Sequence, residues 1–181
     1  VPYRLSGLIL TYIDTLILGS IVSLSSAGEY SVAYKAGMGV VLLNSALFLS
    51  MDPQIMRNLG KNEFLMTIRT SIDKNSKLFF LFSFILAVYS EHLVLLLAGP
   101  EYIHSVKIVP VIVLSYAFTF VYEQFARISK FVHKTYVNTV VMFSSAALNI
   151  ILNYCFIPKY GFTAAAYATL VSSIFLVIQS L

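Results

Sequence analysis

The sequence predicts an all-α integral membrane protein built as a bundle of six transmembrane helices. Hydrophobic residues make up 59% of the 181 residues and charged residues only 11%, whereas a typical soluble domain carries roughly 25% charged residues. The mean hydropathy is +0.84. Apolar segments of the length that crosses a bilayer, roughly 20 residues, alternate with short polar connections. The chain therefore has no room for a large extramembrane domain.

Glycine, proline and charged residues divide the chain into six apolar segments. Asp14 interrupts the first segment once, and a turn is expected at 25–28. A break or kink is expected at 52–53, because proline removes a backbone donor and restricts the residue before it. The pair at 99–100 ends the third segment, and 158–161 forms a tight turn. The predicted helices cover about 5–24, 29–51, 78–97, 106–126, 135–157 and 162–181.

The longest polar connection, 57–77, is predicted to lie along the membrane surface. Helix-period spacing aligns Phe64, Leu65, Ile68 and Ile72 as an apolar stripe within this charged segment. An amphipathic helix of this kind rests in the interface with its apolar side toward the lipid.

The basic residues predict the orientation of the chain in the membrane. If the N-terminus and the connections 57–77 and 127–134 share one side, that side holds nine of the 12 Lys and Arg residues. Positively charged loops remain in the cytoplasm, so this side is predicted to be cytoplasmic. The other three basic residues are Lys35, Lys107 and Lys159.

The net charge of +4 does not indicate a nucleic-acid partner. The basic residues flank apolar segments, and no Lys- and Arg-rich tract is interleaved with aromatic residues. The lipid bilayer is the partner that this pattern predicts. The chain begins with Val-Pro and ends within an apolar run, so we expect it to be part of a longer protein.

Ionisable residues at membrane depth are costly, roughly 2.5–3.5 kcal/mol each on insertion scales, so they mark candidate functional positions. Asp14 lies about 15 Å from the predicted cytoplasmic end of its helix, at 1.5 Å per residue. Lys35 enters the next helix from the outer side, and its long side chain could reach Asp14. This ion pair would either fix the two helices together or take part in substrate or ion handling.

The fourth segment carries a polar stripe. Tyr116, Thr119, Glu123, Arg127 and Lys130 follow one another at spacings that place them on one helix face. Glu123 and Arg127 stand in the favourable order for an ion pair four residues apart. The stripe predicts the wall of a water-filled cavity. An interfacial salt bridge with side chains that extend to the membrane surface is the alternative.

The fifth segment carries a second polar face, made by Asn138, Ser145, Asn149 and Asn153. Amides buried in hydrocarbon need hydrogen-bonding partners, so this face is predicted to contact protein or water rather than lipid. Hydrogen bonding between helices is the simpler interpretation. Small residues at 144–147 and 164–168 would let the helix backbones approach.

No enzyme is predicted. The residues His92, His104 and His133 are scattered without metal-ligand spacing, and no catalytic or phosphate-binding motif is present. Neither a metal site nor an organic cofactor is expected.

Four stretches resemble one known family. YIDTLILGSIVSLSSAGEYSVAYKAG (12–37) has an intramembrane Asp, a Leu-Gly pair, a short outer turn and Gly-x-Tyr-Ser-x-Ala-Tyr. ALFLSMDPQIMRNLGKNE (46–63), LLLAGPEYIHSVKIVPVIVLSYAF (95–118) and LNIILNYCFIPKYGFTAAAYATLVS (148–172) follow in the same order and spacing as in that family. The chain resembles the C-terminal half of Wzx-type O-antigen and polysaccharide flippases. Their superfamily also holds the lipid II flippase and the multidrug (MATE) exporters.

The resemblance implies one lobe of a transporter of 12 to 14 helices in two lobes, in the bacterial plasma (inner) membrane. The implied substrate is an undecaprenyl-diphosphate-linked oligosaccharide, moved from the cytoplasmic to the outer leaflet. The implied partners are the N-terminal lobe of the same chain, and a polysaccharide polymerase and chain-length proteins.

A diphosphate headgroup needs cations, and sugars need polar groups. The candidates for binding the phosphates are Lys35 and Arg127. The candidates for binding the sugars are Tyr116, Asn149 and Asn153, with Thr119 and Glu123 in the same cavity wall. Asp14 or Glu123 could carry a coupling proton or sodium ion.

Two other functions compete with this interpretation. A multidrug or organic-cation exporter of the same superfamily would have an acidic cavity without Lys or Arg. A membrane-embedded polysaccharide polymerase would need a sizeable outer loop, and the predicted outer connections are short.

Overall fold

The computed structural model describes the backbone of residues 2–58, 64–131 and 135–180, and the side chains of 12–58, 64–127 and 136–180. Throughout these residues the secondary structure is helical, without a strand. The elements are α1 (Pro2–Ile21), α2 (Leu24–Asn58), α3 (Phe64–Val88), α4 (Ser90–Ala98), the 3-10 helix η1 (Pro100–Ile108), α5 (Val109–Phe131) and α6 (Thr135–Ile178).

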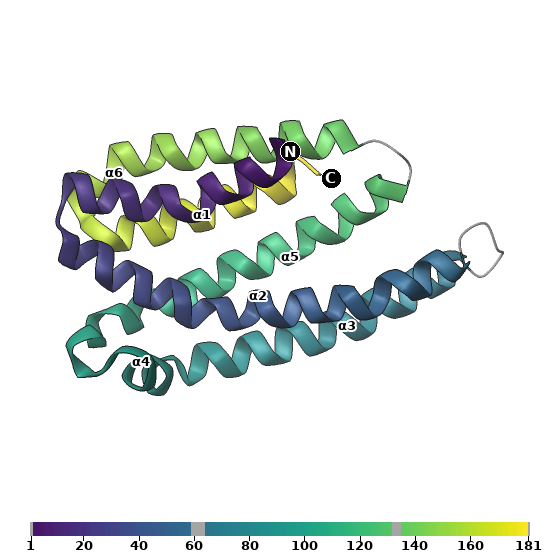
Figure 1. The fold of residues 1–181 in the computed structure, drawn as a ribbon, viewed down its shortest axis with the longest axis horizontal. Coiled ribbons are helices and arrows are strands. Elements are labelled where there is room, and N and C mark those ends of the chain that lie inside the picture. The colour runs from purple at the N-terminus through teal and green to yellow at the C-terminus, as the bar shows by residue number, and fades with distance from the viewer. Residues whose placement is uncertain (1, 59–63, 132–134, 181) are drawn as a thin grey trace.

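Helix α6 is folded back on itself. Gly161 has non-helical angles, φ 61° and ψ −144°, and lies just after Pro158. The two arms, 135–160 and 162–178, run antiparallel, as Figure 1 shows in green and yellow. The hydroxyl of Ser145 in the first arm donates to the carbonyl of Ser172 in the second, at 2.5 Å. The tight turn predicted at 158–161 is therefore confirmed.

The helices are those of a membrane-embedded protein. Among the described residues, three helical segments are long and apolar enough to cross a membrane: 24–58, 100–127 and 136–178. The pair α3 and α4, bent by 69°, makes a fourth if it forms one span. Length and composition therefore give three or four spans instead of the predicted six. Helix α6 is counted once although it turns back, and the part of α1 whose side chains are described is the short apolar helix Tyr12–Ile21.

The prediction that 57–77 lies along the membrane surface is wrong. Instead α2 continues to Asn58 and α3 begins at Phe64, so the described parts of the segment belong to the ends of two long helices. Within the apolar stripe, Ile68 is buried against Met51 and Ile55, and Phe64 and Ile72 pack partly buried beside them, whereas Leu65 is exposed. The sequence pattern was amphipathic because one side of α3 faces α2.

Several predicted boundaries also shift. Helix α2 contains Pro53 and continues beyond it, so of the break or kink expected at 52–53 the break is absent. The turn expected at 25–28 lies earlier, because the Ser23 hydroxyl accepts a hydrogen bond from the Ser26 N–H and α2 begins at Leu24. The segments predicted at 78–97 and 106–126 become α3 with α4, and α5 preceded by η1.

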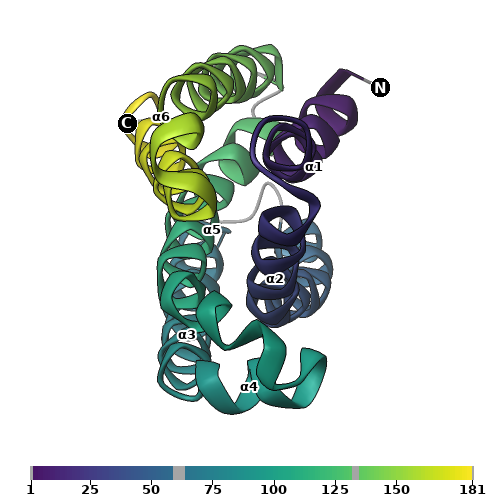
Figure 2. The same cartoon turned by 90° about the vertical axis from the view of Figure 1, so that its left-hand side faces the viewer.

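The bundle has two helical layers joined by α5. Helices α1 and α6 form one layer and α2 with α3 the other, and Figure 2 shows α5 beneath α6 and beside α2, so that it contacts both layers. The main core fills the junction with Tyr30, Ala33 and Val40 of α2 and Ile112 and Phe120 of α5. Small residues allow this approach, since a Cβ on Gly37 would lie 2.9 Å from Cγ2 of Ile112.

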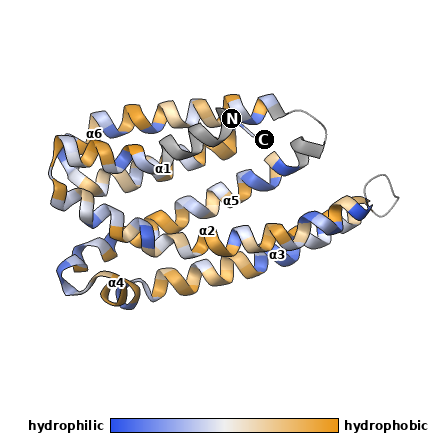
Figure 3. Ribbon diagram, viewed as in Figure 1, coloured by the Kyte–Doolittle hydropathy of each residue, from blue (hydrophilic) through white to orange (hydrophobic). Residues whose placement is uncertain are grey.

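The distribution of polar and apolar residues also follows the helical bundle. Apolar residues colour most of α3 and α6, and hydrophilic residues gather toward the two ends of the bundle (Figure 3). The polar ends of α2, α3 and α5 share one end, while η1 and the turn at Gly161 lie at the other (Figure 1). Among the described residues, Arg57, Arg69 and Arg127 therefore lie toward one end, and Lys107 and Lys159 lie at the other.

Candidate functional site

A buried carboxylate lies where four helical segments meet. Asp14 of α1 is 0% exposed. Its Oδ2 accepts hydrogen bonds from the Tyr30 hydroxyl of α2 at 2.6 Å and from the Thr169 hydroxyl at 2.8 Å. Its Oδ1 accepts one from the Asn153 amide. Thr169 and Asn153 come from the two arms of α6, so this cluster ties both layers of the bundle together.

The local sequence explains the convergence. Asp14, Ile17 and Leu18 lie on the buried side of α1. The second arm of α6 opposes them with Ala165 and Ala166, both fully buried, and such small side chains let the backbones approach. Thr169 follows one turn later and brings its hydroxyl to the carboxylate.

The predicted ion pair between Asp14 and Lys35 is not formed. Lys35 is exposed, and the described ion pairs join Lys77 to Asp73 and Arg127 to Asp52. Lys35 lies five residues beyond Tyr30 and its side chain leaves the bundle. Neutral donors take its place at Asp14, because hydroxyl and amide groups can reach a buried carboxylate without burying a second charge.

The Asp14 cluster has the chemistry of a site for a proton or a small cation. A carboxylate without a cationic partner, buried in an apolar bundle, is costly unless it is neutralised. The amide of Asn153 also donates to Oδ1 of Asn149 at 3.0 Å. Its own Oδ1 is buried without a hydrogen-bond partner. Carboxylate, hydroxyl and amide oxygens together suit a hard cation.

In the described part of the chain the Asp14 cluster contains neither His nor Cys. No three His, Cys, Asp or Glu side chains come together there. The chemistry of the cluster is therefore that of oxygen ligands alone.

A cavity of about 230 Å³ lies next to this cluster, between α5, α2 and the arms of α6. Tyr116, Thr119 and Glu123 line it from α5, and Asn149 lines it from α6. The four were sequence candidates, and the structure brings them together. Thr169 also lines the cavity while bonding Asp14, so the two sites share one hydroxyl.

Glu123 lies between two cavities. Its Oε2 accepts a hydrogen bond from the Asn44 amide of α2 at 2.6 Å. A smaller space of about 90 Å³ on the α2 side is lined by Asn44, Tyr116, Thr119 and Glu123. The face of α5 that bears the polar stripe is thus turned toward internal space on both sides, rather than toward lipid.

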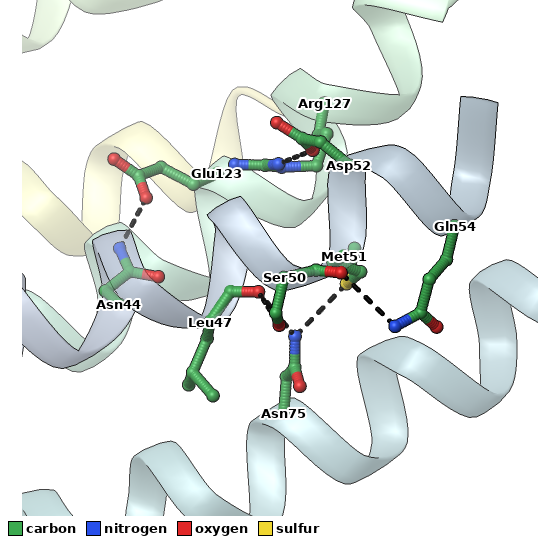
Figure 4. A network of polar contacts seen from close by, with 9 residues as sticks. All are labelled: Asn44, Leu47, Ser50, Met51, Asp52, Gln54, Asn75, Glu123 and Arg127. Atoms are coloured by element: carbon green, nitrogen blue, oxygen red, sulfur yellow. Dashed lines mark hydrogen bonds and ion pairs between the residues drawn. The ribbon is translucent and has the colours of Figure 1, made fainter.

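Arg127 pairs with a partner that the sequence analysis did not identify. Its guanidinium forms an ion pair with Asp52 of α2 and lies 3.4 Å from the ring centre of Phe48. Figure 4 shows the Glu123 carboxylate directed toward Asn44 and the Arg127 guanidinium toward Asp52. The predicted pairing of Glu123 with Arg127 is therefore replaced by contacts that each residue makes with α2.

The cations proposed from sequence do not line the main cavity. Lys35 is exposed, and Arg127 lies near the end of the bundle, beyond Glu123. Among the described residues that line this cavity, Glu123 carries the charge, and neither Lys nor Arg contributes to the lining. Asn153 lies outside the lining but within the Asp14 cluster. Lys130 lies outside the residues whose side chains are described.

Sequence reasoning missed the residues Asn44, Asp52, Tyr30 and Thr169. Asn44 had a detectable signal, because an amide in the apolar run of α2 requires a partner. Tyr30 and Thr169 had none, because isolated tyrosines and threonines are common in membrane helices.

The fold and the site together define a class of protein: an all-α membrane-embedded bundle with an internal cavity, lined by both polar and apolar residues, beside a buried carboxylate. Comparisons with protein-family models, with curated proteins and with solved structures found no match for this chain.

Proposed function

We propose that this chain is one six-span lobe of a flippase that moves an undecaprenyl-diphosphate-linked oligosaccharide to the outer leaflet of a bacterial plasma membrane. The six spans would be α1, α2, α3, α5 and the two arms of α6. The ends of α2, α3 and α5 would face the cytoplasm. The resemblance of four sequence segments to polysaccharide flippases supports this proposal.

The observation that carries the proposal is a cavity inside an apolar bundle whose lining includes hydroxyl- and amide-bearing residues. These include Thr119, Ser145, Asn149 and Ser172. Sugar hydroxyls need hydrogen-bonding partners when they leave water, because unpaired polar groups in an apolar medium are costly. A lining of this kind would replace the water around a glycan during its crossing.

The size of the cavity supports a two-lobe arrangement. At about 230 Å³ it is smaller than the roughly 300–1,000 Å³ of pockets that enclose drug-sized ligands. A glycan of several sugars does not fit within it. In the proposed transporter this lobe forms one wall, and rocking against a second lobe gives alternating access.

The diphosphate would be bound outside this cavity, at the end of the bundle that holds Arg127. The guanidinium is near the surface, with 16% of the side chain exposed, and Asp52 is 52% exposed. The Nε of Arg127 has no hydrogen-bond partner. A diphosphate could displace the more exposed Asp52, since Arg binds phosphate through paired hydrogen bonds.

Asp14 would carry the coupling proton or sodium ion. It touches the cavity through Thr169, so neutralising Asp14 changes which hydrogen bonds Thr169 makes. The proposed coupling site would then lie next to the proposed substrate path.

An organic-cation exporter is the second candidate, and one observation favours it. Glu123 lines the main cavity, and neither Lys nor Arg lines it among the described residues. An acidic cavity attracts a cation and repels a diphosphate. The two functions therefore predict opposite roles for Glu123.

The experiment that tests the proposal uses a bacterium whose own O-antigen flippase is deleted. The full-length protein is expressed there as wild type and as Glu123→Gln, Arg127→Ala and Asp14→Asn, and surface polysaccharide is measured at matched membrane expression. Ser45→Ala is the control, because the Ser45 hydroxyl is exposed and bonds only the Val41 carbonyl of its own helix.

We expect wild type and Ser45→Ala to restore surface polysaccharide, and Arg127→Ala and Asp14→Asn to lose it. Strains that display several different glycans are tested, because flippases select their own substrate. Failure in all of them, together with Glu123-dependent resistance to cationic dyes, would replace the flippase proposal with the exporter.

A further inference from the structure

The outer side of the α6 hairpin carries a groove that the proposed transport path does not use. It has a volume of about 360 Å³ and lies between the two arms, close to the turn at Gly161. Ala164 and Ala168 are buried, whereas Phe156 is 46% and Tyr167 57% exposed. Small residues thus form the floor, and large apolar residues form the sides.

The groove is formed by helices of membrane-spanning length and composition. The segment 136–178 is one of the helices long and apolar enough to cross a membrane. The polar side of α6, with Asn149, Asn153 and Thr169, faces the Asp14 cluster instead. On the second arm, Thr163, Tyr167 and Val171 of the groove lie on the side of the helix away from Thr169. None of the residues that line the groove lines the cavity beside Asp14.

An exposed lysine adjoins one of the residues that line the groove. Lys159 is exposed at the hairpin turn and directly precedes Tyr160, which lines the groove. It has no ion-pair partner among the residues that the structure describes. Tyr160 is 65% exposed, and tyrosine favours the level of the lipid headgroups.

We propose that this groove binds one phospholipid of the surrounding leaflet, with an acyl chain between the two arms and an anionic headgroup at Lys159. The apolar groove selects a hydrocarbon chain, and the unpaired ammonium selects a negatively charged headgroup. A basic residue near the membrane surface attracts an anionic lipid.

Site-specific fluorescence tests the proposal, because the chain contains no tryptophan. Tyr167→Trp places a reporter in the groove. Tyr154→Trp is the matched control, since Tyr154 is 59% exposed on the first arm and does not line the groove. Each variant is reconstituted in bilayers of unlabelled phosphatidylcholine. Increasing fractions of phosphatidylglycerol or phosphatidylcholine with brominated chains, which quench tryptophan, are then added.

In the groove, half-maximal quenching is expected at about a fivefold lower fraction of brominated phosphatidylglycerol than of brominated phosphatidylcholine, as the attraction of one lysine predicts. At Tyr154→Trp the two lipids should quench equally. Adding Lys159→Gln to the groove reporter should abolish the preference, while Lys107→Gln, which removes another exposed lysine, should leave it.

Equal quenching by both lipids in the groove would overturn the proposal. So would quenching in the groove that is weaker than at the control position, because that result means that protein covers the groove. A preference that survives Lys159→Gln would also overturn the assigned headgroup contact.

Discussion

Replacing Asp14 with alanine should destabilise the protein by about 2–5 kcal/mol. The carboxylate accepts three side-chain hydrogen bonds, from Tyr30, Thr169 and Asn153. Hydrogen bonds between membrane helices contribute on average about 0.6 kcal/mol and at most about 1.7 kcal/mol each. Three of them give the stated range. The donors come from three segments, so their loss weakens the contact between the two layers.

The free energy of unfolding can be measured by titrating the protein in mixed micelles with sodium dodecyl sulfate and following helicity. Asp14→Asn should lose less than Asp14→Ala, because one carbonyl oxygen still accepts hydrogen bonds. Ser45→Ala, which removes only an exposed bond within α2, should change the value by less than about 0.5 kcal/mol. If Asp14→Ala matches Ser45→Ala, the cluster does not hold the bundle together.

Three further predictions follow from the same structure. Sodium at ten times its dissociation constant should raise the free energy of unfolding by about 1.4 kcal/mol. A choline salt at the same concentration should leave it unchanged. If the sodium effect persists in Asp14→Asn, the ion binds at another site. Gly37→Ala should cost about 1–3 kcal/mol by overpacking, because its Cβ would lie 2.9 Å from Ile112; an unchanged thermal midpoint would show that α5 moves freely. Gly161→Ala should cost about 1–3 kcal/mol through backbone strain alone, because φ is +61° and no atom lies within 4 Å of the added Cβ; a neutral result would contradict the sharp turn.

The membrane character and the positions of most helices could be predicted from sequence because they depend on local properties. Apolar runs define the helices, and the Pro-Lys-Tyr-Gly turn at 158–161 is a local signal that the structure confirms at Gly161. The 57–77 segment was misinterpreted, because an apolar stripe beside charges fits either a lipid surface or a neighbouring helix. The packing of Ile68 against Met51 and Ile55 is a tertiary contact that sequence periodicity does not specify.

In the candidate site, too, local features were predictable from sequence and tertiary contacts were not. Helical spacing correctly grouped Tyr116, Thr119 and Glu123 on one face of α5, and the structure places that face on a cavity. The partners of charged residues were not predictable, since Asp14 meets groups up to 155 residues away in sequence. Arg127 likewise reaches across to α2. Spacing along one helix cannot choose between a partner on that helix and one on a neighbour.

The long sequence separation within the Asp14 cluster has a consequence for biosynthesis. Thr169 is made 155 residues after Asp14, which takes about 8–30 s at the usual rates of about 5–20 residues per second. During that time α1 holds a carboxylate whose final hydrogen-bond donors on α6 do not yet exist. Helix α1 is therefore expected to stay beside the insertion machinery or near water until the α6 hairpin arrives, and to reach its final place only then.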